Sequence, residues 1–111
     1  MKYLKNIRPL QQGDVILKAV ELEDGDLGEK EPNLILAHGE SGHTHVVFEG
    51  LAQIFLLNGT SEGKRVLEVL SDYAFLKHEE HKGFKVPKGT WEIGRVMEYD
   101  HFKEEAREVM D

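Results

Sequence analysis

The segment "HGESGHTHVV" at residues 38–47 places three histidines and one glutamate within ten positions. If residues 43–49 form a strand, His43 and His45 project from one face, because side chains two positions apart point the same way. Glu49, four positions after His45, then lies on that face as well. Two imidazoles and a carboxylate are a ligand set for a divalent Zn, Mn, Fe or Ni ion. The spacing therefore predicts a metal site formed by His43, His45 and Glu49.

A second cluster, "HEEH" at residues 78–81, lies between two apolar runs. Residues three apart face opposite sides of a regular strand, so these histidines converge only if the strand ends in a turn or bulge. Lys82 and Gly83 follow directly and are suited to such a turn. His78 and His81 are further candidate ligands, and we expect one of them, rather than both, to coordinate the ion.

The alternative is that these histidines are polar turn residues that bond to the backbone and to water. His38 and His101 stand apart from both clusters, and we interpret them as structural or surface residues. Nucleophilic catalysis has little support, since Ser41 lacks the Gly-x-Ser-x-Gly spacing of a nucleophile elbow. The glycine-rich fingerprints of nucleotide-binding loops are absent too. The catalytic residues of any enzyme activity therefore stay undefined by the sequence.

Composition limits the remaining function classes. The chain has no cysteine, which excludes disulfides, thiolate nucleophiles and cysteine-ligated metal sites. Its formal net charge of −7 argues against a general nucleic-acid binder, because such binding depends on Lys and Arg neutralising phosphates. No apolar run approaches the ~20 residues of a membrane span, and the N-terminus lacks the pattern of a secretion signal. We expect a cytoplasmic protein that binds neither nucleic acid nor membrane.

The segments that must position the histidines have the pattern of short strands, separated by turns that are rich in glycine, proline and polar residues. We expect the acidic segment 23–32 to be a solvated loop, and Gly94 indicates a bulge or a bend. From Asp100 onward the apolar residues recur at helical spacing, which predicts a short C-terminal helix. About eight strands suit a closed barrel or jelly roll, so we predict one all-β domain over residues 1–111. The expected strands cover residues 15–21, 33–38, 43–49, 51–57, 65–70, 73–78, 84–86 and 90–99.

These motifs resemble those of the cupins, which are small β-barrels. The first cupin motif contains His-x-His followed by Glu, as in "HTHVVFE" at residues 43–49, and the second contains Gly and then Pro-x-Gly, as in residues 83–89. The resemblance implies a cupin-like barrel in which His43, His45 and Glu49 are metal ligands. Glu92 stands where the family has its fourth ligand histidine. The run from residue 78 to residue 100 also looks like that of small uncharacterised bacterial and phage proteins.

The leading hypothesis is a divalent-metal protein with a small-molecule pocket; the alternative is a non-enzymatic interaction module with surface histidines and no metal. The alternation of side chains along the strand at residues 43–49 distinguishes these two hypotheses. If His43 and His45 face the interior, Val46 and Phe48 must face outward, whereas apolar character alone favours these two residues in the core. A homodimer that covers the outer apolar face would reconcile the inward histidines with the outward Phe48.

Overall fold

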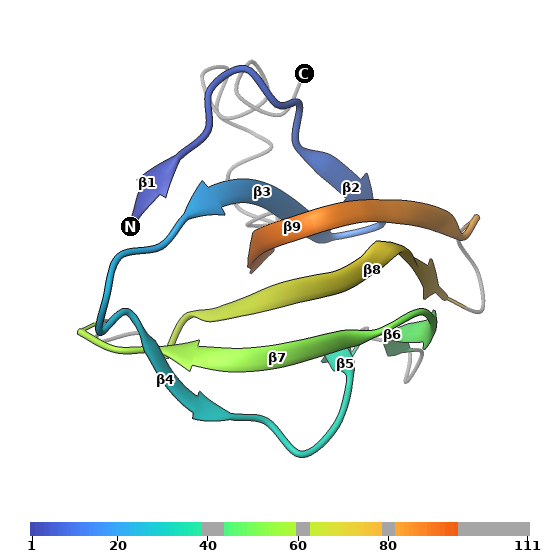
Figure 1. Cartoon of the computed structure of the whole chain (residues 1–111). Coiled ribbons are helices and arrows are strands. Elements are labelled where there is room, and N and C mark those ends of the chain that lie inside the picture. Colours follow the sequence, from blue (N-terminus) through green and yellow to red (C-terminus); the bar gives the residue numbers. More distant parts are fainter. Residues whose placement is uncertain (39–43, 60–62, 79–81, 96–111) are drawn as a thin grey trace, which may run out of the picture.

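The protein is described by a computed structural model that covers residues 1–38, 44–59, 63–78 and 82–95 (Figure 1). The described residues contain strands and no helix, which confirms the all-β prediction. The C-terminal helix expected after Asp100 lies outside the described residues. The strands are β1 Lys2–Tyr3, β2 Leu10–Gln12, β3 Val15–Glu21, β4 Leu27–Lys30, β5 Ile35–His38, β6 Thr44–Glu49, β7 Ala52–Leu57, β8 Arg65–Lys77 and β9 Phe84–Arg95.

All strand pairs are antiparallel and belong to one sheet with β8 at its centre. Strand β9 pairs with β8 along one edge, while β7 and then β6 pair with its other edge. Strand β3 follows β9 and carries both β1 and β2, whereas β5 pairs with β6 and β4 with β7. Within the described residues the main order, β1-β3-β9-β8-β6-β5, is open at both ends.

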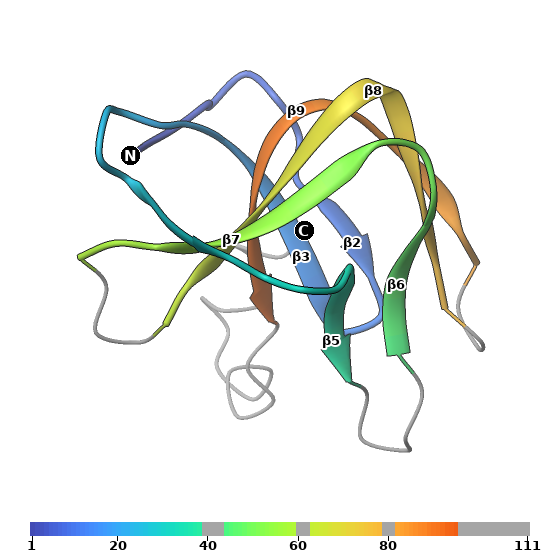
Figure 2. The same cartoon turned by 60° about the horizontal axis from the view of Figure 1, so that its bottom comes forward.

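The three central strand paths bend at one level, and this bend folds the sheet over on itself (Figure 2). Strands β6 and β7 are joined at Gly50, whose φ is +103°. In β8, Val69 pairs with Gly89 of β9, and the register shifts before the next pair at Tyr73. Gly89 also has a positive φ, +141°. Glycines tolerate such φ values because they have no Cβ, so the β6–β7 path and β9 can turn here, while β8 bends at its register shift.

The bend explains where strand prediction fails. Residues 65–70 and 73–77 belong to one strand, β8, and residues 84–86 and 90–95 belong to one strand, β9. The sequence shows an interruption at each bend, but the backbone pairing continues through it. The bulge expected at Gly94 is wrong, because this residue pairs with Ile16 in regular register.

Short strands also form where the sequence shows little apolar alternation. Strand β4 lies within the acidic segment 23–32, where Leu27 pairs with Leu57 and Lys30 with Phe55. Strand β2 is a three-residue strand that pairs with β3 just before the turn at Gly13. Strand β4 exposes three of its four side chains, and the one buried residue of β2 is the polar Gln12, so hydrophobic periodicity carries no signal for either strand.

The hydrophobic core fills the inside of the bent sheet. Trp91 lies in it and donates its indole N–H to the carbonyl of Pro87 at 3.0 Å. Among the described residues, no helix is present that could cross a membrane. The largest group of buried core residues is Val15, Leu17, Ala19, Leu36, Val47, Ile54, Leu67, Val69, Ala74, Leu76, Val86 and Trp91.

Candidate functional site

Strand β6 turns its histidine inward and its phenylalanine outward. The side chain of His45 is 1% exposed and that of Phe48 is 65% exposed. Apolar alternation alone favours the opposite arrangement, and that expectation is wrong here. Val47 fills the inward position two residues after His45, so Phe48 faces outward by regular alternation. The register shift between Val47 and Glu49 interrupts the alternation, and Glu49 is exposed as well.

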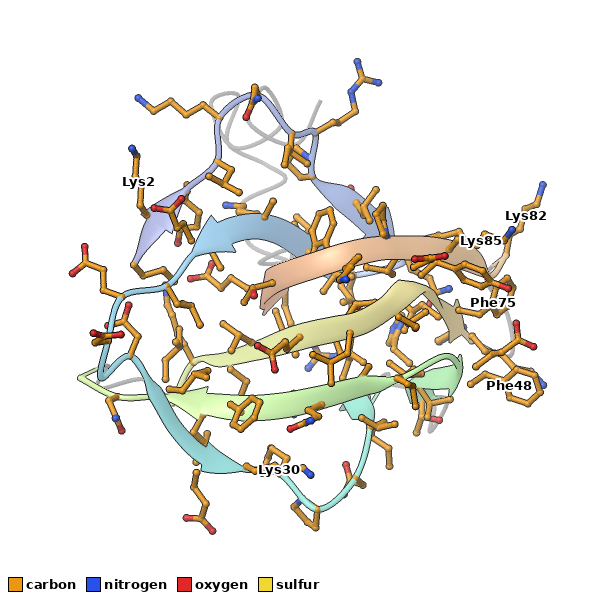
Figure 3. All side chains as sticks on the ribbon, viewed as in Figure 1. Lys2, Lys30, Phe48, Phe75, Lys82 and Lys85 are labelled. Atoms are coloured by element: carbon orange, nitrogen blue, oxygen red, sulfur yellow. The ribbon has the colours of Figure 1, made fainter. Side chains whose placement is uncertain are left out.

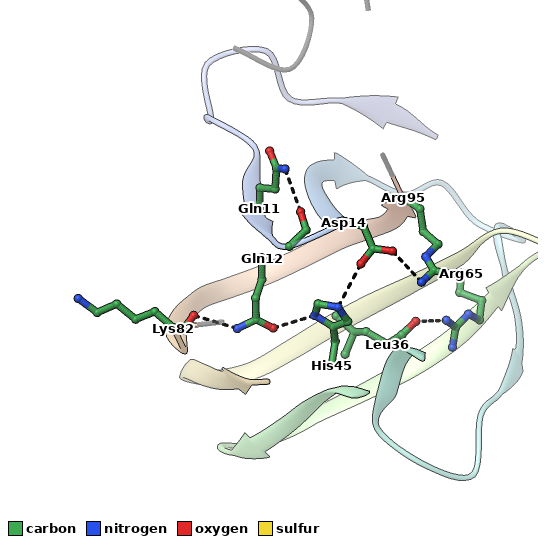
Figure 4. A network of polar contacts seen from close by, with 9 residues as sticks. Gln11, Gln12, Asp14, Leu36, His45, Arg65, Lys82 and Arg95 are labelled. Atoms are coloured by element: carbon green, nitrogen blue, oxygen red, sulfur yellow. Dashed lines mark hydrogen bonds and ion pairs between the residues drawn. The ribbon is translucent and has the colours of Figure 1, made fainter. Parts of the chain in front are cut away.

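Both ring nitrogens of His45 contact side chains from the turn between β2 and β3 (Figure 4). Nδ1 lies 2.9 Å from Oε1 of Gln12, and Nε2 lies 3.3 Å from Oδ1 of Asp14. Gly13, between these two residues, has a φ of +58°, which allows the tight turn. The other carboxylate oxygen of Asp14 is 2.8 Å from the guanidinium of Arg95. A buried imidazole is thus satisfied by an amide and a carboxylate.

The amide of Gln12 continues the network toward the end of β8. Its Nε2 donates hydrogen bonds of 3.1 Å to the carbonyls of Leu76 and Lys82. The side chain is 3% exposed. In the described part of the chain, every buried side-chain nitrogen and oxygen has a hydrogen-bond partner. Burial of this polar cluster therefore does not leave a donor or acceptor unsatisfied.

His78 brings the second sequence cluster to the first. Its side chain is 8% exposed, and its ring centroid lies 4.2 Å from that of His45, with the planes tilted by 39°. The cause is backbone register: Val46 of β6 pairs with Lys77 of β8, so the next positions along the two strands are His45 and His78. The structure thus joins two clusters that the sequence shows as separate.

Glu49 does not share the environment of His45. Its side chain is exposed, and its Oε1 accepts a 3.3 Å hydrogen bond from the hydroxyl of Tyr73. The predicted set of His43, His45 and Glu49 requires a regular strand, whereas β6 has its register shift before Glu49. His43 and His81 lie outside the described residues.

Glu92, which the cupin resemblance places at the fourth ligand position, is engaged elsewhere. Both of its carboxylate oxygens accept from the hydroxyl of Tyr3, at 2.9 and 2.8 Å, and Lys64 lies 3.8 Å away. Burial and the bonded, negatively charged Glu92 raise the pKa of Tyr3 to about 12. Because Glu92 is 5% exposed, these partners compensate for burying its charge.

The described residues do not by themselves complete a metal centre. Across residues 1–38, 44–59, 63–78 and 82–95, no group of three or more histidine, aspartate or glutamate side chains is arranged to hold one ion. Of the cupin-type set, the described members His45 and Glu49 lie in different environments, one buried and one exposed. What the structure does assemble is one buried pair of imidazoles, with the carboxylate of Asp14 beside one of them.

Comparison with known protein families adds one match. Residues 11–96 match the family described as Domain of unknown function (DUF8820). This chain belongs to the DUF8820 family. The DUF8820 match includes Gln12, Asp14, His45, His78 and Arg95, so the whole polar cluster lies within the family domain, whereas β1 precedes it. No curated protein and no solved structure matches the chain.

Proposed function

We propose that this DUF8820 domain binds a divalent transition-metal ion with the imidazoles of His45 and His78, completed by His43 and His81. The supporting observation is the 4.2 Å separation of the two ring centroids. It joins the two histidine clusters of the sequence at one place. His43 is two positions before His45, and His81 is three positions after His78, so each described histidine has a second one nearby along the chain.

The donor chemistry favours a particular class of ion. Imidazole nitrogens suit Zn, Fe, Ni and Cu, whereas Mg and Ca prefer sets composed of oxygen ligands. Asp14 contributes a negative charge 3.3 Å from Nε2 of His45, which would offset part of the charge of a cation. This set differs from the cupin-type one, because His78 and His81 take the place of Glu49.

The residues of this chain would hold the ligands in place and limit access of water. Both rings are buried, and the contacts with Gln12 and Asp14 restrict the imidazole of His45 to one orientation. An ion bound there would supply Lewis acidity, or a structural link between β6 and the end of β8.

A second candidate function is a metal-free interaction module. It is favoured by the complete bonding of His45, whose contacts to Gln12 and Asp14 explain a histidine in the core without any ion. The apolar and exposed Phe48 then becomes the more interesting feature, as part of a protein-binding face. The two candidates differ in metal content, which can be measured directly.

The deciding experiment is inductively coupled plasma mass spectrometry on tag-free protein purified without chelator. We expect about one equivalent of metal in the wild-type protein, and loss of most of it in His45→Ala and in His78→Ala. His101→Ala is the matched control, since it removes a histidine outside both clusters. Its metal content should equal that of the wild type.

Metal-free wild-type protein that also takes up no added Zn, Mn, Fe, Ni or Cu would refute the proposal. Circular dichroism of each variant establishes whether it is folded, because His45→Ala leaves Gln12 and Asp14 without their imidazole partner. Titration of the wild type with Zn needs no variant, so the proposal stays testable if His45→Ala unfolds.

A further inference from the structure

We propose that Gln12 is the positioning residue of this site. Its amide determines which ring nitrogen of His45 bears the hydrogen, and it ties down the segment that carries His78. The consequence for metal binding rests on the proposed function. The consequence for the imidazole does not, and it can be measured in metal-free protein.

The orientation of the Gln12 amide follows from its neighbours. One end of the amide lies 3.1 Å from the carbonyl oxygen of Leu76 and 3.1 Å from that of Lys82. Carbonyl oxygens only accept hydrogen bonds, so this end must be the NH₂ group, which has two hydrogens to donate. The amide oxygen is then at the other end, where it faces Nδ1 of His45 at 2.9 Å.

The protonation of the imidazole follows in turn. An amide oxygen has no hydrogen to donate, so the short contact requires a hydrogen on Nδ1 of His45. The carboxylate of Asp14 is also an acceptor, and it receives a hydrogen from Nε2 only in the doubly protonated ring. In the neutral ring the two acceptors compete for one hydrogen, and we assign it to Nδ1 because the contact with Gln12, at 2.9 Å, is shorter than the 3.3 Å contact with Asp14. Histidine ligands of metal ions commonly donate their other ring N–H to an oxygen acceptor, which fixes both tautomer and ring orientation. Gln12 supplies that acceptor for His45.

The same amide also holds the chain around His78. The carbonyls of Leu76 and Lys82 lie on either side of residues 78–81 in the sequence, and one NH₂ group bonds to both. Because Gln12 is buried, neither bond competes with bulk water. Gln12 therefore links the β2–β3 turn to both ends of the segment "KHEEHK" at residues 77–82. A single side chain thereby positions the two histidine-bearing parts of the site relative to each other.

The first test is the tautomer of His45 in metal-free wild-type protein, measured by ¹⁵N NMR of the ring nitrogens at a pH where the ring is neutral. Assignment of the His45 signals comes from their absence in His45→Ala or, if that variant is unfolded, from through-bond correlations. We expect the hydrogen on Nδ1. A hydrogen on Nε2 in the wild-type protein would overturn the inference without recourse to any other variant.

The second test compares Gln12→Met with Gln11→Met as the matched control. The methionine keeps the length of the glutamine but has neither the amide donor nor its oxygen. Gln11 is adjacent and exposed, and its amide bonds only to the carbonyl of Gly13 within the described contacts, at 2.9 Å. We expect Gln12→Met to lose the preference for hydrogen on Nδ1, while Gln11→Met retains it. An unchanged tautomer in folded Gln12→Met would contradict the role of Gln12.

Zinc affinity then separates this inference from the proposed function. We expect Gln12→Met to bind Zn ~10–100-fold more weakly than Gln11→Met, as is typical when a residue that orients a metal ligand is removed. Equal affinities would overturn the positioning role in metal binding. If the wild type shows hydrogen on Nδ1 but takes up no Zn, the effect of Gln12 on the imidazole stands and the metal proposal fails.

Discussion

His45 and His78 lie opposite each other on neighbouring strand paths, with their ring centroids 4.2 Å apart. The pairing of Val46 with Lys77 dictates this contact, because the next residues along the antiparallel strands are the two histidines. A change that shifts the register of β6 against β8 would therefore separate the rings. The bend at Gly50, which leads β6 into β7, is thus part of what builds the site.

Gly50→Ala should strongly destabilise the fold. A Cβ at this position would lie 2.5 Å from the carbonyl oxygen of Tyr73 and 2.9 Å from Cα of Ala74, both of which are backbone atoms. The positive φ adds strain, and we expect a loss of ~2–4 kcal/mol in the free energy of unfolding. Urea denaturation provides the measurement.

Gly25→Ala is the control for this substitution. Gly25 also has a positive φ, +89°, but an added Cβ would meet no atom within 4 Å. It should lose only ~1 kcal/mol, from the backbone strain alone. Equal losses for the two variants would show that the close approach at Gly50 is unimportant.

Arg65→Lys should loosen the attachment of β5. Arg65 donates to the carbonyls of Ile35 and Leu36 and pairs with Glu31 at 3.2 Å. Lysine has no planar fork to reach these acceptors together, so we expect a loss of ~1–3 kcal/mol. Hydrogen exchange should show faster exchange of the β5 amides. Arg8→Lys, at an exposed arginine, should leave that exchange unchanged.

Tyr3 should make stability depend on pH in the alkaline range. Its pKa is raised from 10.0 to about 12, so the folded state favours the protonated hydroxyl. This contribution is complete below the unfolded pKa and is lost as pH rises from about 10 to about 12. Tyr3→Phe should remove that part of the alkaline loss. Stability measured at several pH values in this window, for both proteins, provides the test.

The same Tyr3→Phe variant should be less stable at neutral pH. It removes the hydroxyl that donates to both oxygens of Glu92, and we expect a cost of about 1 kcal/mol because Tyr3 is partly exposed. If stability at neutral pH and its decrease at alkaline pH are both unchanged, the contact with Glu92 does not contribute to the free energy of unfolding.

Phe48→Ser should have little effect on stability. The Phe48 side chain projects from the sheet near its edge (Figure 3), with Nζ of Lys77 4.7 Å from the ring centroid. Because the ring is mostly exposed, we expect a change below ~1 kcal/mol. The neighbouring Val47→Ser should lose ~2–4 kcal/mol, since it places a hydroxyl in the core. Similar losses for both variants would contradict this assignment of faces.

Sedimentation velocity of Phe48→Ser also tests the homodimer predicted from the sequence. If a second copy covers the face of Phe48, the variant should dissociate at concentrations where the wild type is dimeric. A wild type that sediments as a monomer at high concentration would refute the dimer.

Much of the strand pattern can be predicted from the sequence, because local hydrophobicity and turn residues carry it. Residues 15–21 form the expected strand with the expected bounds, and the turn after Leu57 occurs at Asn58 and Gly59. Strand β4 was missed because backbone pairing with β7, rather than its own side chains, holds it. Glu49 does not share the environment of His45, because β6 has a register shift before it that no local signal in the sequence marks.

The sequence by itself determined that this protein is all-β, that it has no cysteine chemistry, and that histidines are its candidate ligands. These properties depend on residue types and short-range periodicity. Only the tertiary structure decided which histidines meet and which way they face. His45 and His78 come together through long-range register, and Gln12 and Asp14 reach His45 from another turn. Such contacts depend on how the sheet bends, and the physical reason is that pairing energy between distant strands leaves no trace in either strand alone.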